Sequence, residues 1–322
     1  MLRDLFDANP PHGGRGRYAP SPTGPLHLGN LRTALVAWLQ CRLTGGAFVL
    51  RMEDLDHPRT VEGSAEQILD DLRWLGLDWD EGPDVGGPYG PYTQSERDDI
   101  YAEALLELAA RGLVFRCWCS RKDIAEAASA PHDRSPAYPG TCRALGPDDI
   151  VRVQAEKPDR VPAWRFRVGS QVVQIDDEVC GMLSQDLSTE VGDFVLRRAD
   201  GLFAYQLAVV VDDILMGITD IVRGADLLDS TPRQVALFEA FGFDPPRFWH
   251  VPMMHDDRGQ RLAKRHESES LDRLRDAGTS AAEVVGRLAS TLNLVPEGTV
   301  ITARELLDHL DLQALRSGLR KH

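Results

Sequence analysis

The spacing of hydrophobic and polar positions divides the first part of the chain into alternating helices and strands. Apolar residues recur every three or four positions in segment 31–43 and two glycines follow, so this segment is predicted to be an amphipathic helix. The run AFVLRMED, residues 47–54, is typical of a buried strand with a polar end, and a second helical pattern covers 63–77. Strands and helices in this alternating order favour an α/β fold with a parallel sheet.

The hydrophobic pattern changes in the middle of the chain. Segment 117–190 contains short β-like pieces among prolines and glycines, namely AWRFRV at 163–168 and QVVQID at 171–176, which indicates an insertion. Residues 191–250 again show the alternating pattern of the first part of the chain, with a strand, an apolar helix and a second strand. We therefore expect one α/β unit in two halves, 1–116 and 191–250, separated by an insertion. A charged, helical region at 251–322 follows, with a final helix pair in 302–322.

Composition narrows the classes of protein that fit. With 322 residues and 43% hydrophobic positions, the chain can bury a sizeable core. A formal net charge of −14 argues against nonspecific nucleic-acid binding, because that binding needs concentrated Lys and Arg. No apolar run approaches the ~20 residues of a membrane span, and the polar N-terminus lacks a signal peptide. Five cysteines, an odd number, favour reduced thiols, so we expect a cytoplasmic protein without membrane contact.

The stretch RYAPSPTGPLHLGNLRTAL, residues 17–35, is a candidate anion site. A strand that ends in a Pro-Gly turn and is followed at once by a helix presents the first N–H groups of that helix to a ligand. Gly24 and Gly29 permit close approach, and His27 can donate to a phosphate. The P-loop pattern is absent from the sequence, so a nucleotide would be held differently. The alternative interpretation is a rigid Pro-rich corner with a capping histidine.

A group of cysteines is a candidate zinc site. FRCWCSRKD contains Cys117 and Cys119, and AYPGTCR contains Cys142. Thiolates in a reducing compartment suit Zn²⁺, which takes four ligands in a tetrahedron. Three cysteines leave one position open, for which His132 is the common chemical choice. The site is expected to be structural, and buried thiols without metal are the alternative.

The opening stretch resembles the HIGH signature of class I aminoacyl-tRNA synthetases in its glutamate-specific version, with segment 27–30 (HLGN) in the signature position. Downstream, segment 261–265 (RLAKR) resembles the KMSKS loop of the family, although Ala263 replaces the usual serine and Arg261 the first lysine. The resemblance covers about residues 15–268. It implies a Rossmann-type parallel-sheet catalytic domain with a zinc-bearing insertion and a small helical C-terminal region, acting as a ligase on ATP with Mg²⁺.

The resemblance also implies a set of functional residues. Glutamate has two carboxylates and one ammonium group, which two arginines and one acid would match. We expect Arg17 to bind the side-chain carboxylate, Glu53 with Ser21 the ammonium, and Arg223 with Tyr205 the remaining oxygens. His27 and Lys264 are the expected catalytic residues. The implied sets are, for glutamate, Arg17, Tyr18, Ala19, Pro20, Ser21, Glu53, Tyr205 and Arg223; for ATP, His27, Gly29, Asn30 and Lys264; and for zinc, Cys117, Cys119, Tyr138 and Cys142. On chemistry alone, His132 and Tyr138 remain equal candidates for the fourth zinc ligand.

Three further features resemble a truncated subfamily of these enzymes. They are the cysteine pattern, the segment VRGADLLDSTPRQ at 222–234, and the 58 residues after Lys264, too few for the anticodon-binding domain of conventional members. The subfamily activates glutamate without tRNA and then attaches it to the queuosine base at the wobble position of tRNA(Asp). The anticodon stem-loop would enter the catalytic cleft of a monomer. The alternatives are a minimal conventional glutamyl-tRNA synthetase, a non-catalytic glutamate- or ATP-binding paralogue, and a small-molecule nucleotidyltransferase.

Overall fold

The core of the protein is a four-stranded parallel sheet. The computed structural model describes residues 14–120, 122–124, 138–170, 172–254 and 270–321. The strand order is β2-β1-β8-β9, and every neighbouring pair is parallel, as the sequence predicted. Arg17 of β1 lies between Val49 and Ile221 of its two neighbours. The strands span Arg15–Tyr18 (β1), Ala47–Leu50 (β2), Asp220–Gly224 (β8) and Arg247–Val251 (β9).

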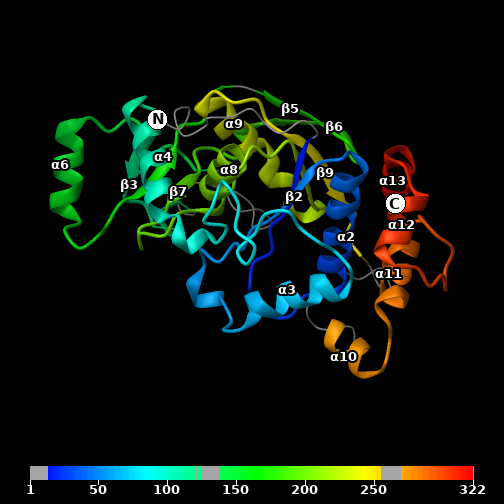
Figure 1. Ribbon diagram of the computed structural model, residues 1–322. Coiled ribbons are helices and arrows are strands. Elements are labelled where there is room, and N and C mark those ends of the chain that lie inside the picture. The colour runs from blue at the N-terminus through cyan, green and yellow to red at the C-terminus, as the bar shows by residue number, and fades with distance from the viewer. Residues whose placement is uncertain (1–13, 121, 125–137, 171, 255–269, 322) are drawn as a thin grey trace.

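Helices cover both faces of this sheet (Figure 1). The helices predicted at 31–43 and 63–77 are confirmed, and the first begins three residues earlier because His27 caps it. The helices of this part of the chain span Leu28–Leu43 (α2), Ser64–Trp74 (α3), Asp98–Ala110 (α4), Tyr205–Leu215 (α8) and Thr231–Phe241 (α9). Short 3₁₀ turns span His57–Arg59 (η1), Gln94–Glu96 (η2) and Ala225–Ser230 (η3).

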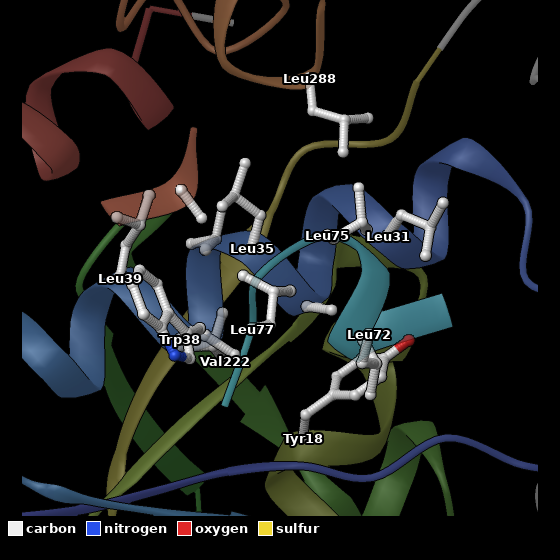
Figure 2. Close-up of a cluster of buried hydrophobic side chains, with 14 of the residues drawn as sticks. Tyr18, Leu31, Leu35, Trp38, Leu39, Leu72, Leu75, Leu77, Val222 and Leu288 are labelled. Carbon is white, nitrogen blue, oxygen red and sulfur yellow. The ribbon is translucent and has the colours of Figure 1, made fainter. Parts of the chain in front are cut away.

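Helix α2 is buried on nearly every side, and the prediction of an amphipathic helix was wrong. All residues of segment 34–41 are buried. One side packs on β1 and β8, and the opposite side packs on helices from the C-terminal region. Figure 2 shows Leu31 and Leu35 of α2 between Val222 of β8 and Leu288 of the C-terminal region. A helix covered on two sides has no need of a polar face.

The middle of the chain forms two small antiparallel sheets. One contains β3 (Val114–Cys117), β4 (Ala163–Phe166) and β7 (Val195–Arg197), and it draws a strand from each side of the expected insertion. The other is a hairpin of β5 (Val172–Asp177) and β6 (Gly181–Asp186), which packs on β9 and α9. Both predicted β-like pieces are therefore strands. This region also contains helices α6 (Pro147–Glu156) and α7 (Leu187–Glu190).

The C-terminal region is helical and lies beside α2 (Figure 1). The predicted final helix pair is confirmed. Ser280 and Thr302 cap α11 and α12 through reciprocal hydrogen bonds with glutamates three residues on. No helix in the described ranges has both the length and the apolar character needed to cross a membrane. Within residues 270–321, the helices span Leu271–Asp276 (α10), Ala281–Ser290 (α11), Ala303–His309 (α12) and Leu312–Leu319 (α13).

Close packing of α11 generates a stability prediction. A Cβ added at Gly286 would collide with the carbonyl oxygen of Thr299, which is backbone and cannot easily move. We expect Gly286→Ala to lower the free energy of unfolding by about 1–3 kcal/mol. In an exposed helix the same change would stabilise the protein by ~1 kcal/mol. Urea unfolding measures the effect, with Gly169→Ala as the control because nothing lies within 4 Å of its added Cβ. A Gly286→Ala variant as stable as the parent would contradict this packing.

Candidate active site

A cavity of about 1320 Å³ opens at the carboxyl ends of β1, β8 and β9. The chain passes from β1 to β2 on one side, whereas β8 lies on the other side of β1. Ligands of open α/β sheets bind at such a reversal of strand order. The described residues implied for glutamate and ATP all line the cavity, although they come from distant segments: Arg17, Tyr18, Ala19, Pro20, Ser21, His27, Gly29, Asn30, Glu53, Tyr205 and Arg223. Lys264 lies outside the described residues.

The first turn of α2 forms one wall of the cavity. His27 is the N-cap, and its Nδ1 accepts a hydrogen bond from the backbone N–H of Asn30 at 3.3 Å. Since Nδ1 is an acceptor, the neutral ring carries its proton on Nε2. Gly29 leaves room for the imidazole, because an added Cβ would lie only 3.0 Å from Cε1 of His27. The capping role and a donor role toward a ligand are therefore compatible.

A buried ion-pair network forms the floor of the cavity. Asp213 of α8 accepts from Nε of Arg17 at 3.3 Å and from Nη1 of Arg51 at 2.8 Å. Arg51 also donates from Nη2 to Glu53 at 3.0 Å. Burial alone would raise the pKa of Asp213, but Arg17 and Arg51 hold this pKa below its usual value. Burial does raise the pKa of Glu53, against the opposing effect of the arginines.

Asp212 extends this network away from the cavity. Its carboxylate accepts from Nε of Arg97 at 2.7 Å, from Gln94 at 2.8 Å and from the Tyr101 hydroxyl at 2.9 Å. No motif or local pattern in the sequence singled out Arg51, Asp212 or Asp213 as part of the site. The available signal was two adjacent carboxylates inside the apolar run LAVVVDDILM, since buried acids need partners.

Arg223 of β8 has a different environment from that of Arg17. It donates from Nε to His250 at 3.1 Å, from Nη1 to Gln234 at 2.6 Å and from Nη2 to Thr231 at 2.7 Å. Burial lowers the pKa of Arg223. In the described part of the chain, Arg223 forms no ion pair with a carboxylate and its hydrogen-bond acceptors are neutral, although the charge of Asp213 favours the cation at longer range. Tyr205 lines the cavity beside it, and burial raises the pKa of Tyr205.

The cysteine cluster lies apart from the cavity, near the end of β3. The sulfur atoms of Cys117, Cys119 and Cys142 lie within 4.8 Å of one another. The Tyr138 hydroxyl oxygen is 3.4 Å from Sγ of Cys117 and 3.9 Å from Sγ of Cys119, whereas His132 is outside the described residues. A hydrogen bond from Cys142 lowers the pKa of Cys117 to about 4. Three sulfurs and one phenol oxygen therefore converge on one point.

The chain is similar to known proteins over most of its length. The family of class I tRNA synthetase (E and Q) catalytic domains matches residues 15–306, and the chain belongs to this family of ligases. It is 50% identical over 300 residues to the glutamyl-Q tRNA(Asp) synthetase of Symbiobacterium thermophilum, covering 92% of each chain. The corresponding protein of Nitratidesulfovibrio vulgaris is 52% identical over 285 residues, with 88% of this chain and 87% of that protein covered. Within the class, the chain is a member of the glutamyl-Q tRNA(Asp) synthetase family.

Solved structures confirm the expected Rossmann-type class I fold. A glutamate tRNA ligase from Elizabethkingia meningosepticum, in complex with its amino acid, superimposes with a TM-score of 0.81 at 29% identity. The match covers 95% of this chain and 65% of that one, so the chain spans about two thirds of the solved ligase. The glutamate-tRNA synthetase of Elizabethkingia anophelis gives a TM-score of 0.82 at 29% identity, with 97% and 67% covered.

The floor network generates a second prediction. Asp213→Asn leaves two buried arginines without their shared carboxylate, so we expect a loss of about 3–5 kcal/mol of unfolding free energy at neutral pH. Because folding lowers the pKa of Asp213, its contribution is present above the unfolded value of ~3.9 and is lost as pH falls through the folded value. The difference from the parent should therefore shrink in acid.

Urea unfolding of the parent and variant at pH 7 and below pH 4 measures both effects. Asp200→Asn is the matched control, because the ion pair of Asp200 with Arg198 is exposed at the surface. That variant should lose less than about 1 kcal/mol. Equal, small losses in the two variants at pH 7 would show that Asp213 does not stabilise the floor.

Proposed function

We propose that this protein activates L-glutamate with ATP, without tRNA, and then transfers the glutamyl group to the queuosine base of tRNA(Asp). The observation that carries the proposal is the composition of one cavity. Arg17, Arg223 and Glu53 line it together with the first turn of α2. The charges of these side chains complement the two carboxylates and the ammonium of glutamate, and the helix start suits a phosphate.

The two arginines suit carboxylates in different ways. The acceptors of the buried Arg223 charge among the described residues are neutral, so an incoming carboxylate would be its direct counter-ion. Arg17 shares Asp213 with Arg51, donates from Nη1 to the Val222 carbonyl oxygen, and lines the cavity. We assign Arg17 to the side-chain carboxylate, and Arg223 with Tyr205 to the α-carboxylate. Glu53 with Ser21 would bind the ammonium.

The α2 end of the cavity would hold ATP. An oxygen of the glutamate α-carboxylate attacks the α-phosphorus, the bond to the bridging oxygen breaks, and pyrophosphate leaves. The Nε2–H of His27 and the N–H groups near Gly29 and Asn30 would donate to the phosphates as charge builds on them. Both flanks of the segment that contains Lys264 line the cavity, at Met254 and Ser270, which supports its assignment to the same phosphates. Mg²⁺ bound with the nucleotide would neutralise further charge.

The acceptor assignment rests on the relatives and on the size of the cavity. Curated relatives named glutamyl-Q tRNA(Asp) synthetase match 92% of this chain at 46–50% identity. Pockets for a single small molecule have volumes of about 300–1,000 Å³. The larger cavity, at about 1320 Å³, leaves room for an acceptor base beside the adenylate. The anticodon stem-loop would bring queuosine to this opening.

The cysteine cluster fits a structural Zn²⁺. Zn–S bonds of 2.3 Å in a tetrahedron place two sulfurs ~3.8 Å apart. Sγ of Cys119 and Sγ of Cys142 are 3.6 Å apart, and the Tyr138 oxygen is at similar distances from two of the sulfurs. We propose that Cys117, Cys119, Cys142 and Tyr138 hold one zinc, which would fix the end of β3.

Metal analysis tests the zinc proposal. We expect about one zinc per chain in protein purified without added metal, and Cys119→Ser should lose it because three ligands bind more weakly than four. Cys180→Ser is the control, since Cys180 is exposed and outside the cluster. Tyr138→Phe and His132→Ala separate the two candidates for the fourth ligand. Retained zinc in Tyr138→Phe together with loss in His132→Ala would contradict the assignment of Tyr138.

The function is tested with labelled glutamate, ATP and bulk tRNA from two bacterial strains, of which only one makes queuosine. We expect label only in the queuosine-containing pool, and none with His27→Ala, which lacks the phosphate donor. Glutamate-dependent ATP–pyrophosphate exchange without tRNA measures the first step alone. Equal labelling of both pools would instead indicate transfer to the tRNA terminus, as in a conventional glutamyl-tRNA synthetase.

A further inference from the structure

A buried chain of three side chains leads from the β5–β6 hairpin to the cavity. Oδ2 of Asp177, at the end of β5, lies 2.6 Å from Nδ1 of His250 on β9. Nε2 of the same ring lies 3.1 Å from Nε of Arg223 on β8. Asp177 and His250 are both 0% exposed and Arg223 is 4% exposed. Only Arg223 of the three lines the cavity.

The contacts determine where the ring proton lies. The Nε–H group of arginine can only donate, so Nε2 of His250 must accept, and the proton is on Nδ1, where it donates to Asp177. The backbone N–H groups of Val179 and Cys180 also donate to Asp177, at 2.9 and 2.8 Å, and thereby fix the carboxylate. Burial lowers the pKa of His250, and the Arg223 charge lowers it further, against the effect of Asp177. A neutral ring is the form that this arrangement requires.

This chain orients the guanidinium of Arg223 without neutralising it. His250, Gln234 and Thr231 each accept from a different nitrogen of Arg223, so the plane of the group is held at three points. A carboxylate in direct contact would fix the plane equally well, but it would compete with the substrate for the charge. Asp177 is separated from Arg223 by the imidazole of His250. This arrangement orients the guanidinium and leaves its charge available to a ligand.

We propose that His250 and Asp177 are positioning residues that hold Arg223 in the orientation that binds a substrate carboxylate. The proposal rests on the proposed function, in which Arg223 binds glutamate. It assigns the β5–β6 hairpin, through Asp177, a role in amino-acid affinity. Neither residue lines the cavity, and both act through Arg223, which we assign to glutamate. Their effect should therefore appear in the KM for glutamate and not in the KM for ATP.

The three side chains Asp177, His250 and Arg223 form a relay of hydrogen bonds, and steady-state ATP–pyrophosphate exchange tests its role. His250→Phe keeps a buried ring but removes the acceptor, and we expect the KM for glutamate to rise about 10–100-fold while the KM for ATP changes less than about twofold. His250→Gln keeps an acceptor near the position of Nε2 and should recover most of the affinity. Adding His250→Phe to Arg223→Ala should cost nothing more, because the ring acts through Arg223.

A spectroscopic measurement keeps the test independent of variant folding. ¹⁵N-histidine NMR of the parent protein should show His250 as the neutral Nδ1–H tautomer at pH 7. An Nε2–H or charged ring, additive losses in the double variant, or an unchanged KM for glutamate in folded His250→Phe would each overturn the relay. Absence of glutamate-dependent exchange in the parent would instead refute the proposed function, while the tautomer would still report on the relay.

Discussion

The pairing of one carboxylate, Asp213, with Arg17 and Arg51 is the constraint on which the candidate active site depends. A buried charge is costly unless it is paired, so the three elements that carry these residues must lie in one fixed arrangement. They are β1, the end of β2 and helix α8. Arg51 also forms an ion pair with Glu53, which lines the cavity, so the position of Glu53 depends on the same network. The positions of the cavity side chains are thus set by residues beneath them.

The buried arginines and acids of this network are equal in number, and Arg223 is not part of the network. Direct ion pairs join three arginines to three acids in the network of Arg17, Arg51, Arg97, Glu53, Asp212 and Asp213. Arg223 is a further buried cation, and its acceptors His250, Gln234 and Thr231 are all neutral. Glutamate carries a net charge of −1 at neutral pH, so its binding would supply the carboxylate that Arg223 lacks. Glutamine would also bring an α-carboxylate to Arg223. It lacks the second carboxylate, the one assigned to Arg17, so the site as a whole would keep a net positive charge, and this is a physical basis for discrimination.

Local patterns in the sequence predicted much of the fold but few of the supporting residues. The parallel sheet, the two early helices and the final helix pair follow from periodicity, and the cavity residues from motif resemblance. Asp177 and His250 are 73 residues apart and belong to no shared motif, so nothing local indicates their contact. The burial of α2 on two sides could not be predicted from the local sequence either, because it depends on helices more than 200 residues downstream. Long-range packing decides both cases.

Burial of α2 on two sides bears on the chemistry that we propose at its N-terminus. The helix packs on β1 and β8 on one side and on α11, α12 and α13 on the other, so its axis is held by most of the fold. Its first turn lines the cavity, and His27 bridges to Ser270 at the start of the C-terminal region. A helix N-terminus stabilises developing phosphate charge only if it need not reorganise as the reaction proceeds. Packing on both sides of α2 provides that rigidity, and it connects the C-terminal helices to the end of the cavity that we propose binds the phosphates.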